Sequence, residues 1–360
     1  MTIQGRNKLK PQIITIMILT GLIFLVTILA GYPRAIEDYY SQGVYPYICI
    51  VLHSIFNIFP FSVGDVVYLL MIAALICTAL KLFRQLFKRQ FKKSLQTLLG
   101  MVIGIQAAIV IFYLFWGMNY FRPPAAERLK LQDTVYSLTE LKAITALMID
   151  SANATRARLQ HADIKVDNDS IYHIAIAAVD TLSKTSANFR TYYPKVKPSL
   201  LTGVTNYLGT SGYYNPFTGE AQVNYRMPVF IRPFVACHEL SHQMGFGPED
   251  EANFAGFVAG VGSKDRLLRY SAYYSGMTEF MYALRSADSL EFKRYKKRIS
   301  KNVLADLKAE RTYWQYYAGR VEVVSSLFYD SYLKANNQPQ GLMTYNQMIT
   351  LVMAWYREKR

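Results

Sequence analysis

Three long apolar stretches in the first third of the chain constrain the fold more than any other feature. Residues 13–31 and 97–120 carry no charged side chain, and residues 64–83 carry charges only at Asp65 and Lys81. A helix of about 20 mostly apolar residues is long enough to cross a bilayer. We therefore predict a multi-pass α-helical membrane anchor in residues 1–122, with about three transmembrane helices.

A shorter apolar and aromatic stretch lies between the first two predicted spans. Residues 45–60 are interrupted by Pro46, His53 and Pro60. This length and these interruptions favour a helix at the membrane surface over a further span. The first stretch, residues 13–31, is longer than the apolar core of a signal peptide, so we expect it to remain part of the protein.

The positions of the basic residues indicate how the anchor is oriented. The net charge is +15 although only 18% of residues are charged, a balance that fits either a membrane protein or a nucleic-acid-binding protein. Arg6, Lys8 and Lys10 precede the first apolar stretch. A second basic group separates the second and third stretches: Lys81, Arg84, Lys88, Arg89, Lys92 and Lys93. Positive residues flanking spans mark the cytoplasmic side and attract anionic lipid. We therefore expect a cytoplasmic N-terminus, an extracytoplasmic C-terminal domain, the lipid bilayer as partner and no nucleic-acid partner.

The remaining residues, 123–360, have the pattern of a mostly helical α+β domain. A capping-box sequence predicts a helix over residues 137–159, and another helix is expected over residues 170–187. The sequence TYNQ is expected to open a last helix at residue 344. Turn residues followed by period-two alternation predict a β-hairpin over residues 212–226.

The sequence HELSH places three chemically reactive side chains close together. His238, Glu239 and His242 fall within a helix that we expect to cover residues 233–244, with a proline in its first turn and glycines after its end. At 3.6 residues per turn, the two histidines project from one face and can bind one zinc ion. Glu239 can then take a proton from zinc-bound water.

A catalytic zinc ion needs a third protein ligand. No histidine follows His242, and Pro248 occupies the position where a third histidine would complete a HExxHxxGxxH motif. A helix starting at Pro248 would place Glu249 in its first turn, where the helix dipole stabilises acids without any further role. Glu251 would lie inside that helix. We predict Glu251 as the third metal ligand, with Glu249 as the alternative and Asp250 as a residue that orients a ligand histidine.

This set of two histidines and one glutamate resembles the gluzincin zinc metallopeptidases, and DEANFAGF, from Asp250, is similar to their third-ligand segment. The resemblance implies a zincin-like domain, a Zn²⁺ cofactor and an edge strand that binds peptide by β-addition. Residues 220–226 occupy the corresponding place in the chain, with Gln222 and Asn224 as candidate substrate-binding residues. Ala255 stands where an acid is often found.

The sequence leaves the residue that stabilises the oxyanion undecided, because no histidine is available downstream of the motif. The candidates are Tyr270, Tyr273, Tyr274, Tyr313 and Arg320.

A second resemblance covers most of the chain. NYFRPP, SGYYNPFTGEAQVN, CHELSHQMGF, EDEANF and YLKANNQ look like a bacterial family of integral membrane proteins that is named only as a domain of unknown function. It implies the bacterial cytoplasmic membrane as location and implies no substrate.

The predicted function is that of a membrane-anchored zinc metallopeptidase that hydrolyses peptide bonds. The alternative is a non-catalytic membrane scaffold, receptor or assembly factor with a structural or vestigial zinc site. Glu239 separates the two, because a glutamate beside the first ligand serves hydrolysis and a binding module does not need one.

Overall fold

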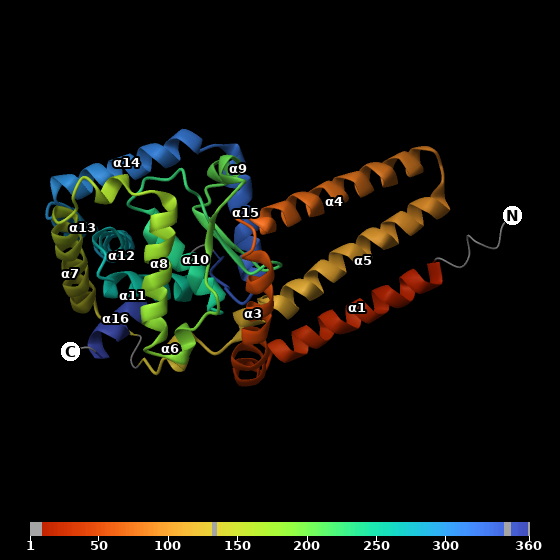
Figure 1. Cartoon of the computed structure of the whole chain (residues 1–360), viewed down its shortest axis with the longest axis horizontal. Coiled ribbons are helices and arrows are strands. Elements are labelled where there is room, and N and C mark those ends of the chain that lie inside the picture. Colours follow the sequence, from red (N-terminus) through yellow and green to blue (C-terminus); the bar gives the residue numbers. More distant parts are fainter. Residues whose placement is uncertain (1–8, 132–134, 342–346, 359–360) are drawn as a thin grey trace.

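The computed structural model describes residues 9–131, 135–341 and 347–358. Three of its helices are long and apolar enough to cross a membrane: α1 (Leu9–Ala30), α4 (Val63–Phe87) and α5 (Phe91–Phe115). They extend side by side from one side of a globular helical part (Figure 1). The prediction of three apolar helices is confirmed. The third ends earlier than expected, because the backbone turns at Trp116 into a short 3-10 helix, Gly117–Phe121.

The chain between α1 and α4 lies at the junction between the long helices and the globular part (Figure 1). It forms α2 (Pro33–Ala35), a π-helix (Ile36–Val44) and α3 (Tyr45–Phe56). One face of α3 is buried, and His53 on that face places its Nε2 atom 2.9 Å from the carbonyl oxygen of Gly219. The helix predicted within residues 45–60 is therefore present and packs against the globular part.

The globular part is mostly helical. Its helices are α6 (Ala125–Arg128), α7 (Leu138–Ala157), α8 (Asn168–Ser183), α9 (Thr202–Tyr207), α10 (Arg232–Gln243), α11 (Glu249–Gly262), α12 (Arg266–Ala287), α13 (Ser289–Lys296), α14 (Lys301–Tyr317), α15 (Arg320–Ala335) and α16 (Met348–Glu358). The capping box at Ser137 and Glu140 is present at the start of α7. The TYNQ sequence lies mostly outside the described residues, and α16 begins directly after it.

Helices α10 and α11 form the centre of the core. Residues 233–243 of α10 are all buried, as are most residues of α11. The two helices approach closely at Gly256, where a Cβ atom would lie 3.0 Å from the backbone nitrogen of His238. A larger residue at this position would push α11 away from the helix that carries the HELSH sequence.

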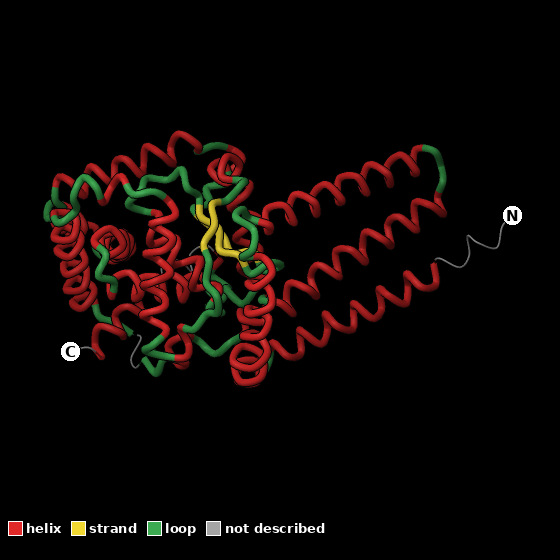
Figure 2. The backbone as a smooth tube through the Cα atoms, in the orientation of Figure 1, coloured by secondary structure: helices red, strands yellow, loops and turns green. Residues whose placement is uncertain are grey.

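A small mixed sheet lies beside α10 (Figure 2). Its strand order is β1 (Val196–Pro198), β3 (Glu220–Val223) and β2 (Gly212–Asn215), with β1 parallel and β2 antiparallel to β3. The predicted hairpin is confirmed as β2 and β3. However, β3 is the central strand, so the expectation that residues 220–226 form an edge strand is wrong. No sequence pattern predicted β1, the strand that pairs with the other side of β3.

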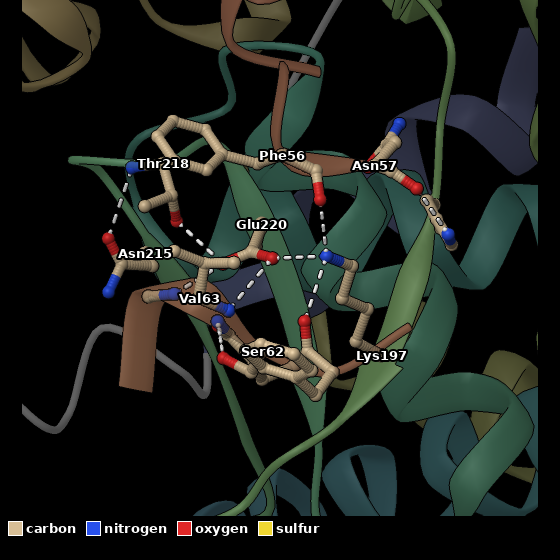
Figure 3. A network of polar contacts seen from close by, with 12 residues as sticks. Phe56, Asn57, Ser62, Val63, Lys197, Asn215, Thr218 and Glu220 are labelled. Carbon is tan, nitrogen blue, oxygen red and sulfur yellow. Dashed lines mark hydrogen bonds and ion pairs between the residues drawn. The ribbon is translucent and has the colours of Figure 1, made fainter. Parts of the chain in front are cut away.

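A buried ion pair joins this sheet to the first turn of α4 (Figure 3). Lys197 of β1 pairs with Glu220 of β3, and both side chains are 1% exposed. Lys197 also donates to the carbonyl oxygen of Phe56 at 2.7 Å. Glu220 accepts hydrogen bonds from the backbone nitrogens of Val63 (3.2 Å) and Gly64 (2.5 Å). A carboxylate at a helix N-terminus satisfies unpaired N–H groups and is favoured by the helix dipole.

Asp65, one residue further along α4, makes a second connection. It is fully buried, and its Oδ2 atom accepts a hydrogen bond of 2.7 Å from the backbone nitrogen of Leu200. Tyr213 of β2 donates its hydroxyl to the same carboxylate. The charge at the edge of the second apolar stretch therefore attaches α4 to the globular part.

Replacing Lys197 by Met tests the importance of the buried pair. Lys197→Met leaves Glu220 buried without its cation, and we expect the free energy of unfolding to fall by about 3–5 kcal/mol. The control is Lys184→Met, because the Lys184–Asp180 pair is 71% and 61% exposed and pairs of that kind contribute about 1 kcal/mol or less. Chemical unfolding of the detergent-solubilised protein, followed by tryptophan fluorescence, measures both. An equal fall in the free energy of unfolding in the two variants would show that the buried pair contributes no more to stability than an exposed pair.

Candidate metal centre

The two histidines of HELSH lie next to each other on α10. His238 and His242 project one turn apart, and their ring centroids are 4.9 Å apart. The side chains of His238, Glu239 and His242 are buried, with potential ligand atoms within 4.8 Å of one another. The helix covers the range expected from the sequence to within one residue.

The carboxylate nearest to both histidines belongs to Glu249. Its Oε2 atom lies 3.1 Å from Nε2 of His238 and 3.6 Å from Nε2 of His242. Glu249 is the first residue of α11, which starts close to the end of α10. Two imidazole nitrogens and one carboxylate oxygen thus converge on one point.

Glu251, the residue expected from the sequence, points elsewhere. Its carboxylate forms a buried ion pair with Arg128 at 2.5 Å and accepts a hydrogen bond of 2.6 Å from the backbone nitrogen of Ala125. Two residues along a helix correspond to a rotation of about 200°, so Glu249 and Glu251 face opposite sides of α11. The geometry therefore replaces Glu251 by Glu249 as the candidate third ligand.

Further side chains hold this group in position. Tyr329 of α15 donates a hydrogen bond of 2.7 Å to Oε1 of Glu249, and the backbone nitrogen of Glu249 donates to Gln338 at 3.1 Å. The Nδ1 atom of His242 lies 2.7 Å from the carbonyl oxygen of Phe246. Because a carbonyl can only accept, Nδ1 carries the proton, and in the neutral ring Nε2 keeps a lone pair that faces Glu249.

Sequence reasoning missed these supporting residues. Tyr329 is one of 28 tyrosines, and no local pattern distinguishes it from tyrosines that only pack. Gln338 had a signal, since it ends the YLKANNQ segment that carried the wider resemblance.

The electrostatics of the site reflect its burial. Burial alone would lower the pKa of His242, but the adjacent carboxylate of Glu249 reverses this effect and raises the pKa to about 9. Burial favours a higher pKa for Glu249, but His242 and His238 hold the pKa well below its usual range. The carboxylate of Glu249 that stabilises the protonated imidazole would also stabilise a metal cation, which would replace the proton on the imidazole nitrogen.

Glu239 lies beside the converging ligands and is 3% exposed. Burial raises the pKa of its carboxyl group to about 7. Its Oε2 atom accepts no hydrogen bond from any residue in the described parts of the chain. Buried carboxylate oxygens without a partner are uncommon in folded proteins, which makes this oxygen a candidate for contact with a ligand.

Strand β2 places its free edge next to Glu239. Ser199 donates its backbone N–H to the carbonyl oxygen of Val223, so Val223 faces β1, and its partner Gly212 directs its own backbone groups outward. Residues two apart in a strand point their backbone groups to the same side, so Tyr214 also directs its N–H and C=O groups away from β3. A Cβ atom on Gly212 would lie 2.6 Å from Oε1 of Glu239. The edge available for an extended peptide is therefore β2.

Gln222 and Asn224, the residues expected to bind substrate, do not lie on this edge. Gln222 is in the central strand β3, Asn224 directly follows it, and both are buried. Their exposed fractions are 0% and 1%. Gln222 is hydrogen-bonded to the Oγ atom of Ser62 at 2.8 Å, and Asn224 donates to the carbonyl oxygen of Thr210 at 3.3 Å. Both polar side chains hold neighbouring segments together because β3 is the central strand.

A cavity of about 2270 Å³ extends over the site. His238, Glu239, His242 and Glu249 all contribute to its lining. The oxyanion candidates named from the sequence do not line it: Tyr270, Tyr273, Tyr274, Tyr313 and Arg320. Three of these tyrosines donate their hydroxyl groups elsewhere, to Asp306, Glu310 and Asn206.

Side chains from the membrane-proximal segments complete the end of α10. Trp116 donates its indole N–H to the carbonyl oxygen of His242 at 2.9 Å, and Tyr45 donates to that of Gln243 at 3.0 Å. Arg122 donates to the carbonyl oxygen of Gly245 at 2.8 Å. These bonds satisfy carbonyl groups that a helix end leaves without a partner.

A family model described as "Protein of unknown function (DUF3810)" matches residues 40–353. The chain belongs to this family. The match includes α4, α5, the sheet and all the residues of the candidate metal centre. No curated protein and no solved structure matched the chain.

Metal analysis of the full-length DUF3810 protein in detergent tests the ligand set. We expect about one zinc ion per chain in the wild type and at least a tenfold weaker affinity in Glu249→Gln, because a ligand is lost. Glu251→Gln is the matched control, and we expect it to keep its zinc but unfold more readily, since Arg128 loses its partner. Metal loss confined to Glu251→Gln would contradict this assignment.

Proposed function

We propose that this protein is a membrane-anchored zinc metallopeptidase. One observation carries the proposal: Oε2 of Glu249 lies 3.1 Å and 3.6 Å from the Nε2 atoms of His238 and His242, with Glu239 buried beside them. Two imidazoles and one carboxylate are a ligand set typical of catalytic zinc, which keeps a fourth position open.

The residues fit this metal by their chemistry. His238, His242 and Glu249 would hold the ion, and Tyr329 would orient the carboxylate ligand, as residues behind metal ligands commonly do. When bound, zinc supplies Lewis acidity that activates water and polarises a carbonyl group.

Glu239 is placed to handle the proton. Its carboxylate lies next to the ligand group and faces the cavity. It would take a proton from the attacking water and deliver it to the nitrogen of the leaving amine as the C–N bond breaks. The oxygen of the water ends on the carbonyl carbon, giving a carboxylate and a free amine.

The free edge of β2 supports a peptide as the substrate of this site. Gly212 and Tyr214 direct backbone N–H and C=O groups away from β3, and Gly212 lies beside Glu239. An extended peptide can pair with such an edge by β-addition, which would align a scissile bond with the metal centre. The ester of a simple lipid has no backbone to pair in this way.

The charge pattern supports a site outside the cytoplasm. The N-terminus and the α4–α5 loop carry the basic residues that mark the cytoplasmic side. The globular part lies at the opposite ends of the three long helices (Figure 1). We therefore assign the N-terminus to the cytoplasm of a bacterium and the metal centre to the outer side of its cytoplasmic membrane.

Reporter fusions test this orientation. Alkaline phosphatase fused after Arg360 is expected to be active, because it folds only after export, whereas a fusion in the α4–α5 loop after Arg89 is expected to be inactive. The loop fusion is the internal control. The reverse pattern of activities would place the metal centre in the cytoplasm and overturn the assignment.

Substitution of Glu239 tests the chemistry. We expect Glu239→Gln to keep zinc and to lose about 10²–10⁴-fold in the rate of peptide hydrolysis, the range typical of a general base. The assay uses the full-length protein with a random peptide library, and products are read by mass spectrometry. Glu127→Gln is the matched control, because Glu127 is half-exposed and does not line the cavity. A zinc-loaded wild type that cleaves no library member would favour the non-catalytic scaffold instead.

A further inference from the structure

The cavity over the metal centre continues between two membrane helices. Its walls include residues along both α4 and α5, among them Leu75, Gln85, Lys93, Gly104 and Phe112. Figure 1 shows α4 and α5 meeting at their connecting loop and separating towards the globular part. We call this part of the cavity the α4–α5 groove.

Contacts at the two ends of the groove hold α4 and α5 together near the loop and apart near the globular part. Near the loop, Thr97 of α5 donates to Gln85 of α4 at 2.8 Å. At the other end, Glu220 accepts hydrogen bonds from the start of α4, while Tyr113 of α5 donates to Asn336 at 3.1 Å. The two helices are thus attached to different segments of the globular part, which keeps them apart.

The walls of the groove are apolar and accessible. Leu75 and Ile105 are 46% and 47% exposed. A Cβ atom on Gly104 would meet no atom within 4 Å, and Ala108, one turn further along α5, also lines the cavity. Small residues at this spacing allow another helix to approach closely within a bilayer.

The groove leads to a reactive group. Glu239, which is buried and has one oxygen without a hydrogen-bond partner among the described residues, lines the same cavity. Tyr68 of α4, Trp116 after α5 and Tyr214 of β2 also line the cavity, and the rings of Trp116 and Tyr214 lie 5.6 Å and 6.3 Å from the ring of His242. Aromatic residues of this kind mark the membrane–water boundary.

We propose that the α4–α5 groove receives a transmembrane helix of a protein substrate, which is then cleaved just outside the bilayer. This inference rests on the proposed peptidase function and adds the substrate class. The substrate helix would end at the aromatic residues that line the cavity. The chain that follows it would continue as an extended segment along β2 and pass beside Glu239.

The length of the groove favours a helix over a lipid. From Lys93 to Phe112 it follows α5 for roughly 29 Å at 1.5 Å per residue, which is about the thickness of the hydrocarbon core. A lipid chain spans about half of that core. Only a transmembrane segment would contact the groove along its whole length and also supply a peptide backbone to β2.

Photo-cross-linking tests occupancy without requiring hydrolysis. The full-length Glu239→Gln protein carries benzoylphenylalanine in place of Ile105, in nanodiscs of phosphatidylethanolamine and phosphatidylglycerol. The probe is a synthetic Leu/Ala transmembrane helix followed by a random juxtamembrane segment. The matched control carries the cross-linker in place of Phe24 on α1, which is 64% exposed and does not line the groove. We expect at least tenfold more probe cross-linked at position 105.

A cleavage assay provides the second measurement. Filling the groove with Gly104→Trp is expected to reduce cleavage of the membrane-inserted probe at least tenfold more than cleavage of its soluble juxtamembrane segment. Gly21→Trp on α1 is the matched control, since a Cβ atom there also meets nothing within 4 Å. Cuts are expected within a few residues of the helix end.

The outcomes separate this inference from the proposed function. Selective cross-linking at position 105 supports the groove even if nothing is cleaved, in which case the peptidase proposal fails by itself. Equal probe cross-linking at positions 105 and 24, or cross-linking at 105 to phospholipid alone, overturns the inference. The inference is also overturned if the zinc-loaded protein cleaves both the membrane-inserted probe and its soluble segment, and Gly104→Trp reduces the two cleavage rates equally.

Discussion

The end of helix α10 is completed by side chains that come from the membrane-proximal part of the chain. Trp116, Tyr45 and Arg122 donate hydrogen bonds to carbonyl groups at and just beyond His242. A buried carbonyl without a partner costs about 1–3 kcal/mol, so these bonds fix where α10 stops. Where it stops determines where α11 starts, and the first residue of α11 is Glu249. The convergence of the metal-centre side chains therefore depends on groups supplied from the membrane side.

The sheet makes the complementary connection. Glu220 and Asp65 attach the first turn of α4 to β3 and β2, and β2 presents its free edge to Glu239. The separation of α4 from α5 and the position of the β2 edge are thus set by the same few buried polar contacts. A displacement of α4 would move β2 relative to the metal centre, which couples the shape of the groove to the geometry of the site.

The sequence predicted those features that depend on local composition or periodicity. The three apolar helices, the helix carrying HELSH and the β2–β3 hairpin all have signals within a short window. The choice between Glu249 and Glu251 depended on how α11 is rotated about its axis, which the loop after α10 and the pairing of Arg128 determine. The central position of β3 in the sheet depended on β1, a strand of only three residues, which pairs with its other side. Tyr329 reaches Glu249 only through tertiary packing, so no local pattern could identify it.

The hydrogen bonds at the end of α10 also determine which fragments of the protein would keep a complete core. A recombinant fragment that begins after the last span would lack Tyr45 and Trp116, and it would also lack Phe56, whose carbonyl oxygen accepts from Lys197. Its core would then contain buried polar groups without partners close to both the candidate metal centre and the sheet. The membrane-proximal segments therefore form part of the scaffold that holds the candidate metal centre and the sheet in place.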